Sequence, residues 1–459
     1  MIRVPLPYCV DALALFERLR DLPQPVLLHS GDRTSAAGRY DVMAADPIRP
    51  VVYQDGELRV GCASTRTEAP FDALPLYFGP NGDRPAKHFR TGFIGYFGYG
   101  LQHTLERLPD GPIDVAGLPL ICGGDYGWSV VTDHLARTTE LWHDANVATP
   151  DVQAIVRRLA RDPAGPVANF SIGTRFSASM SDREYADAFD SIKTYLIAGD
   201  CYQVNLARHY TTSLRGDRHN ASWAAYRRLV GLQPAPFEAY LATPYGDVVS
   251  LSPERFVRKV GARIETSPIK GTAPRHRDTK RDHASLERLR CSEKDRAENL
   301  MIVDLLRNDL GRICRPGSVR VDDLFRVQSF ANVHHLVSTI RGETVAGIDA
   351  WNMLKAVFPG GSITGAPKIR AMEIINQLEP VARSVYCGSI GWVDRSGSLD
   401  TNIAIRTLAF TTSGVHAWGG GGIVADSIAA TEMSEIEHKI GRLLQATAGL
   451  SASSCCSPS

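Results

Sequence analysis

The stretch Ser267-Pro-Ile-Lys-Gly-Thr-Ala-Pro-Arg275 holds one lysine between two prolines and beside a glycine. Pro268 and Pro274 fix φ near the extended region and exclude a helix interior, so we predict an extended segment. Gly271 permits a sharp turn or the close approach of a ligand. Lys270 is then either an ordinary turn lysine in solvent or a partly desolvated amine that acts as a nucleophile. These nine residues alone favour the turn, but the motifs elsewhere in the chain reverse that preference.

The composition is that of a large globular protein. The 459 residues are 44% hydrophobic, and 51 Lys and Arg against 50 Asp and Glu leave a formal net charge of +1. Such a balance gives no basic excess that would indicate nucleic acid or an anionic membrane surface. No apolar run reaches membrane-spanning length, and the 9 cysteines lack CxxC spacing. We therefore expect a cytoplasmic protein with reduced thiols that binds neither nucleic acid nor membrane.

A Pro- and Gly-rich stretch, Asp144 to Asn169, is the best candidate for a linker. We expect an N-terminal region over residues 1–170 and a second region over 171–450. The Ser-rich tail, residues 451–459, is predicted to be disordered.

The N-terminal region has a mixed helix and strand pattern. Val10 to Leu22 follows a helical apolar rhythm, and residues 25–28 and 39–44 are predicted strands. Residues 91–100 alternate glycine with aromatics but lack the frame of a GxGxxG phosphate loop. This alternation indicates close packing of the backbone.

Two helices of the second region carry carboxylates in suggestive places. Ser292 and Asp295 form a capping pair at the start of one helix, and Asp295 and Glu298 share a face of it. In a helix from about Ala429 to Ala446, a stripe of polar residues runs beside the buried apolar stripe; it consists of Glu432, Glu435, Lys439 and Arg442. A salt bridge from Glu435 to Lys439 is the ordinary explanation. One Glu from each helix also suits Mg²⁺, which takes few protein carboxylates and completes its shell with water and substrate.

Three glycine-rich stretches lie between these helices, at residues 358–368, 386–391 and 418–423. The first leads into a helix predicted over residues 369–378, and a helix N-terminus offers free amides to an anion. Arg406 alternates with Ile403 and Ile405, so it is expected to point into a cleft and to bind a carboxylate. Each loop alone is only a turn, but together with the acidic helices they predict a Mg²⁺ site for a small polycarboxylate.

Long motifs in a fixed order resemble the chorismate-utilising enzymes, which include anthranilate, aminodeoxychorismate, isochorismate and salicylate synthases. They are Tyr-Gln-Val-Asn-Leu, Ser-Pro-Glu-Arg-Phe, Pro-Ile-Lys-Gly-Thr, Asp-Arg-Ala-Glu-Asn-Leu-Met-Ile-Val-Asp-Leu, His-Leu-Val-Ser, Gly-Ser-Ile-Thr-Gly-Ala-Pro-Lys, Ala-Ile-Arg-Thr and Gly-Gly-Ile-Val-Ala-Asp-Ser. The similarity is strong from about residue 175 to 448 and weak before it. It implies an α+β fold of two antiparallel sheets packed as a sandwich with helices outside, and strands from both halves of the chain in each sheet.

Lys270 marks the branch that the chain resembles most, the aminodeoxychorismate synthase component I of folate and p-aminobenzoate biosynthesis. Anthranilate synthases resemble this stretch but carry alanine in place of Lys270. The isochorismate branch carries a lysine in place of Gln203, where it activates water. The resemblance therefore implies amination of chorismate at ring carbon 4 to give 4-amino-4-deoxychorismate. Anthranilate synthase component I and a non-catalytic tryptophan-binding regulatory subunit stay open as alternatives.

The resemblance also implies residue roles. Lys270 is the nucleophile, Glu254 is the general acid, and Glu298 and Glu435 hold Mg²⁺ with Asp295 and Glu432 behind them. The residues that bind chorismate are Thr272, His335, Tyr386, Arg406, Gly420, Gly422 and Lys439. In the N-terminal region, Leu28, Ser30 and residues 39–41 resemble a tryptophan site of some relatives.

A separate class I glutamine amidotransferase subunit is the expected source of ammonia. These glutaminases use a cysteine in a Gly-x-Cys-x-Gly elbow, and none of the 9 cysteines stands in that frame.

Overall fold

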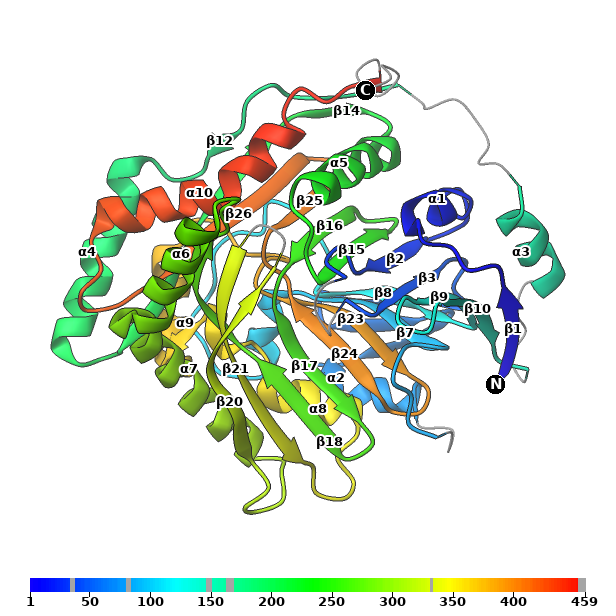
Figure 1. Ribbon diagram of the computed structural model, residues 1–459, viewed down its shortest axis with the longest axis horizontal. Coiled ribbons are helices and arrows are strands. Elements are labelled where there is room, and N and C mark those ends of the chain that lie inside the picture. Colours follow the sequence, from blue (N-terminus) through cyan, green and yellow to red (C-terminus); the bar gives the residue numbers. More distant parts are fainter. Residues whose placement is uncertain (34–37, 80–83, 146–150, 162–168, 331–332, 453–459) are drawn as a thin grey trace.

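The computed structural model describes residues 1–33, 38–79, 84–145, 151–161, 169–330 and 333–452. Within these residues two 12-stranded sheets, paired antiparallel throughout, are combined with helices (Figure 1). This confirms the expected α+β class.

The first sheet contains the N-terminal strand and the strand β26, against which helix α10 (Ala429–Thr447) packs. Its order is β1 (Ile2–Leu6), β10 (Thr138–His143), β9 (Trp128–Asp133), β3 (Tyr40–Ala44), β2 (Val26–His29), β15 (Phe237–Ala242), β16 (Asp247–Ser252), β25 (Thr407–Thr411), β26 (Gly414–Ile423), β13 (Gln203–Thr212) and β12 (Ser177–Ala178), with β22 (Gly365–Ala366) paired to β13.

The second sheet has the strand that carries Lys270 at one edge. Its order is β19 (Ile269–Pro274), β21 (Val333–Glu343), β18 (Arg263–Ser267), β17 (Arg255–Val260), β24 (Leu399–Ile403), β23 (Ser389–Asp394), β7 (Gly92–Phe97), β8 (Ile121–Tyr126), β4 (Arg49–Gln54), β5 (Glu57–Val60) and β6 (Ala63–Arg66), with β20 (Arg320–Ser329) paired to β21. A separate pair joins β11 (Phe170–Ile172) to β14 (Leu214–Gly216).

Helices cover the sheets, and α4, α6, α7, α9 and α10 gather at the left of Figure 1. The α-helices are α1 (Ala12–Glu17), α2 (Pro70–Ala73), α3 (Val152–Leu159), α4 (Asp182–Ala198), α5 (Arg218–Leu232), α6 (Thr279–Cys291), α7 (Glu293–Gly311), α8 (Ala350–Val357), α9 (Lys368–Leu378) and α10 (Ala429–Thr447), and the 3₁₀ helices are η1 (Leu74–Leu76), η2 (Tyr99–Thr104) and η3 (Gly361–Ile363). None of the described helices is long and apolar enough to cross a membrane.

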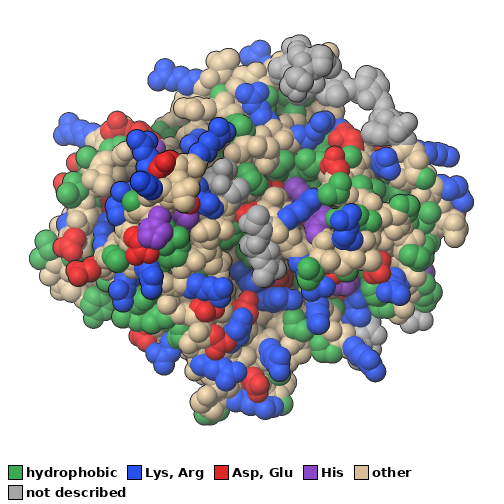
Figure 2. All heavy atoms as spheres, viewed as in Figure 1, with side chains coloured by type: hydrophobic (Ala, Val, Ile, Leu, Met, Phe, Trp, Pro, Cys, Tyr) green, Lys and Arg blue, Asp and Glu red, His purple; other side chains and the backbone are tan. Residues whose placement is uncertain are grey.

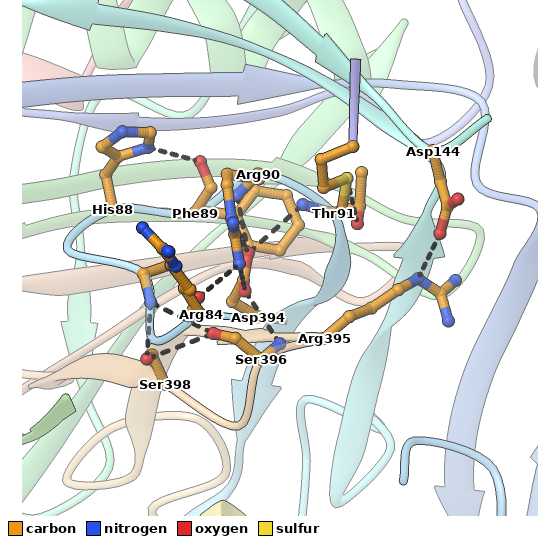
Figure 3. Close-up of polar contacts among 12 residues, drawn as sticks. Arg84, His88, Phe89, Arg90, Thr91, Asp144, Asp394, Arg395, Ser396 and Ser398 are labelled. Atoms are coloured by element: carbon orange, nitrogen blue, oxygen red, sulfur yellow. Dashed lines mark hydrogen bonds and ion pairs between the residues drawn. The ribbon is translucent and has the colours of Figure 1, made fainter. Parts of the chain in front are cut away.

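Each sheet takes strands from both sides of residue 170, as the resemblance implied. Figure 3 shows one place where the two parts are joined by polar contacts. Arg90, just before β7, pairs with Asp394 at the end of β23 at 2.8 Å, and the amide of Ala86 donates to Ser398 at 3.0 Å. The two sheets are also linked, because Asn402 on β24 donates to the carbonyl of Phe237 on β15 at 3.1 Å. The boundary expected at residue 170 between two regions of the chain thus stays a prediction.

Local signals located several elements well. Ser181 and Glu184 form the capping box of α4, and Gly199 ends that helix in the left-handed conformation at φ 80°. The glycines of β7 pack closely against the neighbouring strand, since a Cβ on Gly95 would collide with the carbonyl of Cys122.

The first helix is shorter than predicted. The sequence rhythm predicts Val10 to Leu22, but α1 ends at Glu17, and Arg18 and Leu19 continue with three-residue turns. Asp11 caps the helix by accepting the amide of Ala14, which excludes Val10 from it. The apolar rhythm continued past the end because Leu19 is buried in the turn that follows.

Parts of two expected segments lie outside the described residues: 146–150 and 162–168 of the linker candidate, and 453–459 of the tail. Between the linker gaps lies the short helix α3. On the face drawn in Figure 2, acidic side chains lie among the basic ones, as the near balance of 51 and 50 charges leads one to expect.

Candidate active site

A cavity of about 670 Å³ lies where β13, β19 and β26 meet helices α7 and α10. Its lining includes every residue that the sequence assigned to catalysis, metal binding or chorismate binding: Glu254, Lys270, Thr272, Asp295, Glu298, His335, Tyr386, Arg406, Gly420, Gly422, Glu432, Glu435 and Lys439. These residues are far apart in the chain, so only the fold brings them together.

Lys270 lies on β19, and Gly271 beside it has φ +74°, as the predicted tight turn requires. The register with β21 shifts between Lys270 and Thr272, so β19 is irregular at the lysine. A Cβ on Gly271 would lie 2.8 Å from Leu289 on α6 and 2.9 Å from Asp295 on α7, so glycine lets both helices pack against this strand. The lysine side chain is 11% exposed, and its Nζ donates to Glu298 Oε1 at 2.8 Å and to the carbonyl of Ser362 at 3.3 Å. The amine is therefore held inside the cavity and not in solvent.

Glu254 lies between β16 and β17 and is 5% exposed. Its backbone is fixed on both sides, because its amide donates to Ser252 Oγ at 3.2 Å and its carbonyl accepts the amide of Ile403 at 3.0 Å. Burial raises the pKa of Glu254 to about 7, although hydrogen bonding to Ser362 and the charge of Lys270 oppose the shift. The carboxyl group is thus suited to donate a proton near neutral pH.

The acidic helices place their carboxylates as the pattern predicted. Ser292 accepts the amide of Asp295 and caps α7, while Glu432 on α10 is 3% exposed and accepts a hydrogen bond from Ser427 at 2.7 Å. Lys294 on α7 reaches across to Glu432 at 3.7 Å.

Glu435 is half exposed and pairs with Lys439 at 2.7 Å, so the ordinary salt bridge is present.

The donor set fits Mg²⁺ by its chemistry. Among the described residues, no group of three or more His, Cys, Asp or Glu side chains is arranged to hold a metal ion by itself. Glu298 and Glu435 nevertheless present hard carboxylate oxygens to one cavity, and Mg²⁺ needs only one or two of these besides water and substrate oxygens. Burial opposes ionisation of Glu298, but Lys270 and Lys439 outweigh it and lower the pKa of this carboxyl, so it is charged at neutral pH.

Arg406 is a partly buried cation without a carboxylate partner among the described residues. It lies between β24 and β25 in the left-handed region at φ 52°, and its side chain lines the cavity. Burial lowers the pKa of Arg406 to about 10, so the guanidinium is still charged at pH 7. A charge that is partly withdrawn from water is stabilised by a partner, and an anionic ligand would supply it.

Three further side chains, those of Thr272, His335 and Tyr386, line the same cavity as Arg406. Thr272 Oγ1 and His335 Nδ1 lie 2.9 Å apart. Burial, together with the nearby charge of Arg406, lowers the pKa of His335 to about 3, so the ring is neutral at pH 7. Tyr386 is buried and stacks on Trp418 with ring centroids 6.2 Å apart. This part of the cavity lining therefore combines one cation, Arg406, with neutral hydrogen-bonding groups.

The glycine run of β26 has one open edge. Its register with β13 runs to Val204 and Ile423, whereas its register with β25 ends at Leu408 and Ala417. Gly419 to Gly422 therefore have no strand on the second side among the described residues, and amides on that edge are available to a ligand. This is consistent with the anion-binding role predicted for Gly420 and Gly422.

Glycine at positions 420 and 422 is also required for a second reason, which the sequence did not predict. A Cβ on Gly422 would overlap the amide nitrogen of Gln203, and a Cβ on Gly420 would lie 2.9 Å from Asn205 Oδ1. Gln203 and Asn205 are two residues apart on β13 and so share one face of it, but the sequence did not show what lay beneath them. Their alternation with apolar residues was the only local signal.

The loop at residues 358–368 contributes in a different way from the one predicted. Ser362 and Ile363 line the cavity, but the first residues of α9 are not among its lining. Gly365 and Ala366 form β22 against β13, and Lys368 pairs with Asp309 at 2.6 Å. Strand pairing thus directs the middle of the loop, and not the helix N-terminus, toward the cavity.

A second cavity, of about 200 Å³, lies between the two sheets, and Leu28 and Ser30 line it with Arg39 and Tyr40. Ser30 is held in place, because its Oγ donates to the carbonyl of Tyr40 at 3.0 Å and its amide donates to Asp41 at 2.9 Å. The residues that resemble a tryptophan site therefore do surround one space.

Comparison with known proteins agrees with this geometry. The family model described as chorismate binding enzyme matches residues 34–445. Aminodeoxychorismate synthase component 1 of Salmonella typhimurium is 41% identical over 454 residues, covering 96% of this chain and 97% of the relative. The protein of the same name from Klebsiella aerogenes is 42% identical over 450 residues, covering 96% and 98%. Among solved structures, anthranilate synthase component I from Streptococcus pneumoniae is 27% identical with a TM-score of 0.78, covering 89% of this chain and 93% of that one.

Proposed function

We propose that this chain, which belongs to the chorismate binding enzyme family, aminates chorismate at ring carbon 4. The product would be 4-amino-4-deoxychorismate, on the route to p-aminobenzoate and folate. The observation that carries the proposal is the amine of Lys270 inside the cavity, 2.8 Å from Glu298 and on the same lining as Glu254. The names of the relatives from Salmonella typhimurium and Klebsiella aerogenes support it.

Lys270 and Glu254 would carry the chemistry by double displacement. The deprotonated amine of Lys270 attacks ring carbon 2 while Glu254 protonates the hydroxyl that leaves carbon 4 as water. In this step the nitrogen–carbon bond forms, the two ring double bonds shift, and the carbon–oxygen bond at carbon 4 breaks. Ammonia then adds at carbon 4, the double bonds shift back, and the lysine nitrogen leaves carbon 2. One difficult substitution becomes two easier ones, which gives the amine a role.

The carboxylates of chorismate would be held by Arg406, Tyr386, Lys439 and the amides of Gly420 and Gly422. The uncompensated charge of Arg406 supports this assignment most directly. Thr272 and the neutral His335 would line the ring.

Glu298 and Glu435 would hold Mg²⁺, with Asp295 and Glu432 behind them. The bound ion would act as a Lewis acid that withdraws electron density through the ring carboxylate. Lys294, which lies 3.7 Å from Glu432, would keep that carboxylate oriented.

Ammonia would come from a separate class I glutamine amidotransferase subunit, in the cytoplasm. A glutaminase needs an activated thiolate, whereas burial raises the pKa of both Cys122 and Cys387 to about 12. Cys455 and Cys456 lie outside the described residues.

The test is amination of chorismate by the purified chain with an ammonium salt and Mg²⁺, followed by chromatographic identification of the product. We expect 4-amino-4-deoxychorismate without release of pyruvate. Anthranilate and pyruvate would instead show that the chain is an anthranilate synthase component I, the activity named for the solved structure from Streptococcus pneumoniae. Absence of any amination would favour a binding or regulatory subunit.

The smaller cavity supports a second proposal, that Leu28 and Ser30 help to bind tryptophan. Equilibrium dialysis with labelled tryptophan tests it, with Ser30→Trp as the variant expected to fill the space. Equal binding by both proteins would place any tryptophan elsewhere.

A further inference from the structure

A buried ion pair lies beside the active site but outside its lining. Glu379 and Arg383 are 4% and 2% exposed, and neither lines the main cavity. The guanidinium of Arg383 donates from Nε to Glu379 Oε2 at 2.9 Å and from Nη2 to Glu379 Oε1 at 2.7 Å. A buried ion pair often stabilises a protein no more than apolar side chains of the same volume would. The reason for this pair therefore lies in the other contacts that it makes.

The ion pair takes the place of a strand along one edge of β13. On the side of β13 opposite β26, β22 and β12 pair with its two ends, and no described strand pairs with the residues between them. The carbonyl of Asn205 accepts Arg383 Nη2 at 2.8 Å instead, and the amide of Ala207 donates to Glu379 Oε1 at 2.8 Å. The pair thus satisfies backbone groups that would otherwise be buried without partners.

Arg383 also holds the turn η3, which contacts both proposed catalytic side chains. Its Nη1 donates to the carbonyl of Ile363 at 2.8 Å. The preceding residue, Ser362, accepts Lys270 Nζ at its carbonyl at 3.3 Å, and its side chain is hydrogen-bonded to Glu254. A planar guanidinium with five donors can serve the carboxylate and two carbonyls at once, whereas a lysine has a single nitrogen.

We propose that Glu379 and Arg383 are positioning residues that hold η3 against the catalytic side chains. This rests on the proposed roles of Lys270 and Glu254 in the amination of chorismate. Without the contact from Arg383 to η3, the hydrogen bond from Ser362 to Glu254 should weaken. That hydrogen bond lowers the pKa of Glu254 against the larger, upward effect of burial. Its loss should therefore raise the pKa of this carboxyl further.

The experiment compares wild type with Arg383→Lys, which keeps the charge but replaces the five donors by one nitrogen. Arg370→Lys on α9 is the control, since Arg370 is partly exposed, pairs with Glu373 at 2.7 Å and does not line the cavity. Turnover is measured against pH at saturating chorismate and constant free ammonia. We expect the kcat of Arg383→Lys to fall by about 10²-fold, with the KM for chorismate nearly unchanged. The midpoint of its falling pH profile should move up by about half a pH unit or more, and the control should match wild type.

Ser362→Ala shows whether the effect passes through Ser362. This variant removes the hydrogen bond to Glu254 directly, so by itself it should move the midpoint in the same direction. Adding Arg383→Lys to Ser362→Ala should then move the midpoint no further. The proposal is overturned if Arg383→Lys moves the midpoint equally in both backgrounds. It is also overturned if Arg383→Lys lowers turnover or stability and leaves the midpoint at the wild-type value, because the pair then only supports the fold.

The same shift can be measured without turnover. The pKa of Glu254 also sets the pH at which the fold loses the stabilisation by the neutral acid, so urea unfolding should show this loss at higher pH in Arg383→Lys than in wild type. If Arg383→Lys does not fold, Glu379→Asp takes its place, since it keeps the charge but draws the carboxylate back from Ala207. A wild type that makes anthranilate, or no aminated product, would refute the proposed function, and the unfolding comparison would still decide the positioning role.

Discussion

The amine of Lys270 and the amide of Gln203 both donate to one atom, Glu298 Oε1, at 2.8 and 2.9 Å. The proposed nucleophile and the proposed metal ligand are therefore positioned by the same contact. A substitution at Lys270 is therefore expected to disturb Glu298, and a substitution at Glu298 to disturb Lys270.

Replacing Lys270 by alanine removes the nucleophile of the double displacement. We expect formation of 4-amino-4-deoxychorismate to fall by about 10³-fold or more, with a shift toward the ortho-aminated product because the site then resembles that of anthranilate synthases. Products are quantified by chromatography, with Lys355→Ala on the exposed side of α8 as the control. Full activity in Lys270→Ala would show that the nucleophile lies elsewhere.

Glu298→Gln and Glu435→Gln each remove one hard anionic ligand. We expect the Mg²⁺ concentration for half-maximal activity to rise about tenfold or more in each, with an unchanged circular dichroism spectrum. Glu437→Gln, on the exposed face of the same helix as Glu435, should behave as wild type. An unchanged Mg²⁺ requirement in both active-site variants would contradict the metal assignment.

Glu254 should impose a falling pH profile. Only its protonated form can donate, and burial raises its pKa to about 7. Turnover at constant free ammonia should therefore fall as pH rises through about 7. Glu254→Gln should lower turnover by about 10²- to 10⁴-fold and lose this dependence.

The same shift predicts a change in stability. The unfolded glutamate has the lower pKa, so its protonation stabilises the fold below about pH 4.5, and this contribution is lost as pH rises through about 7. Urea unfolding of wild type and Glu254→Gln over this pH range measures this contribution. The free energy of unfolding should lose it with rising pH in wild type, and should show no such loss in Glu254→Gln. Identical pH dependence of the free energy of unfolding would mean that Glu254 is not buried as a neutral acid.

The chain alone should use ammonia but not glutamine. Free ammonia is a small fraction of ammonium at neutral pH, so turnover with fixed ammonium salt should rise with pH as far as Glu254 permits. Adding the partner glutaminase should confer use of glutamine and flatten the rise. Turnover with glutamine as the sole nitrogen source, by chain free of host glutaminase, would refute the two-subunit proposal.

Two glycines near α10 should respond oppositely to alanine. At Gly422 a Cβ would overlap Gln203 and lie 3.0 Å from Glu298, so we expect loss of activity and about 1–3 kcal/mol of destabilisation. At Gly441, inside α10, a Cβ meets nothing within 4 Å. Gly441→Ala should therefore increase the free energy of unfolding by about 0.5–1 kcal/mol. If Gly422→Ala and Gly441→Ala change the free energy of unfolding equally in chemical denaturation, close packing does not explain why position 422 is glycine.

Local sequence signals predicted those features that depend on a few neighbouring residues. The cap at Ser292, the glycine turn at Gly271 and the shared face of Asp295 and Glu298 all follow from spacing. The end of α1 shows the limit, because the apolar rhythm continues past the last residue of the helix into a buried turn.

The sequence by itself predicted the acidic helices, because these depend on residue type and periodicity. Its motifs implied the α+β class and the set of candidate site residues through their resemblance to a known family. Only the tertiary structure decided that Lys270, Glu298 and Gln203 meet at one oxygen, and that Arg406 lacks a carboxylate partner among the described residues. It also decided that the glycines of β26 make room for Gln203 and Asn205. Such contacts join separate segments, 28 residues apart for Lys270 and Glu298 and 95 for Gln203 and Glu298. Their geometry depends on strand register and helix packing, which no local pattern of residues specifies.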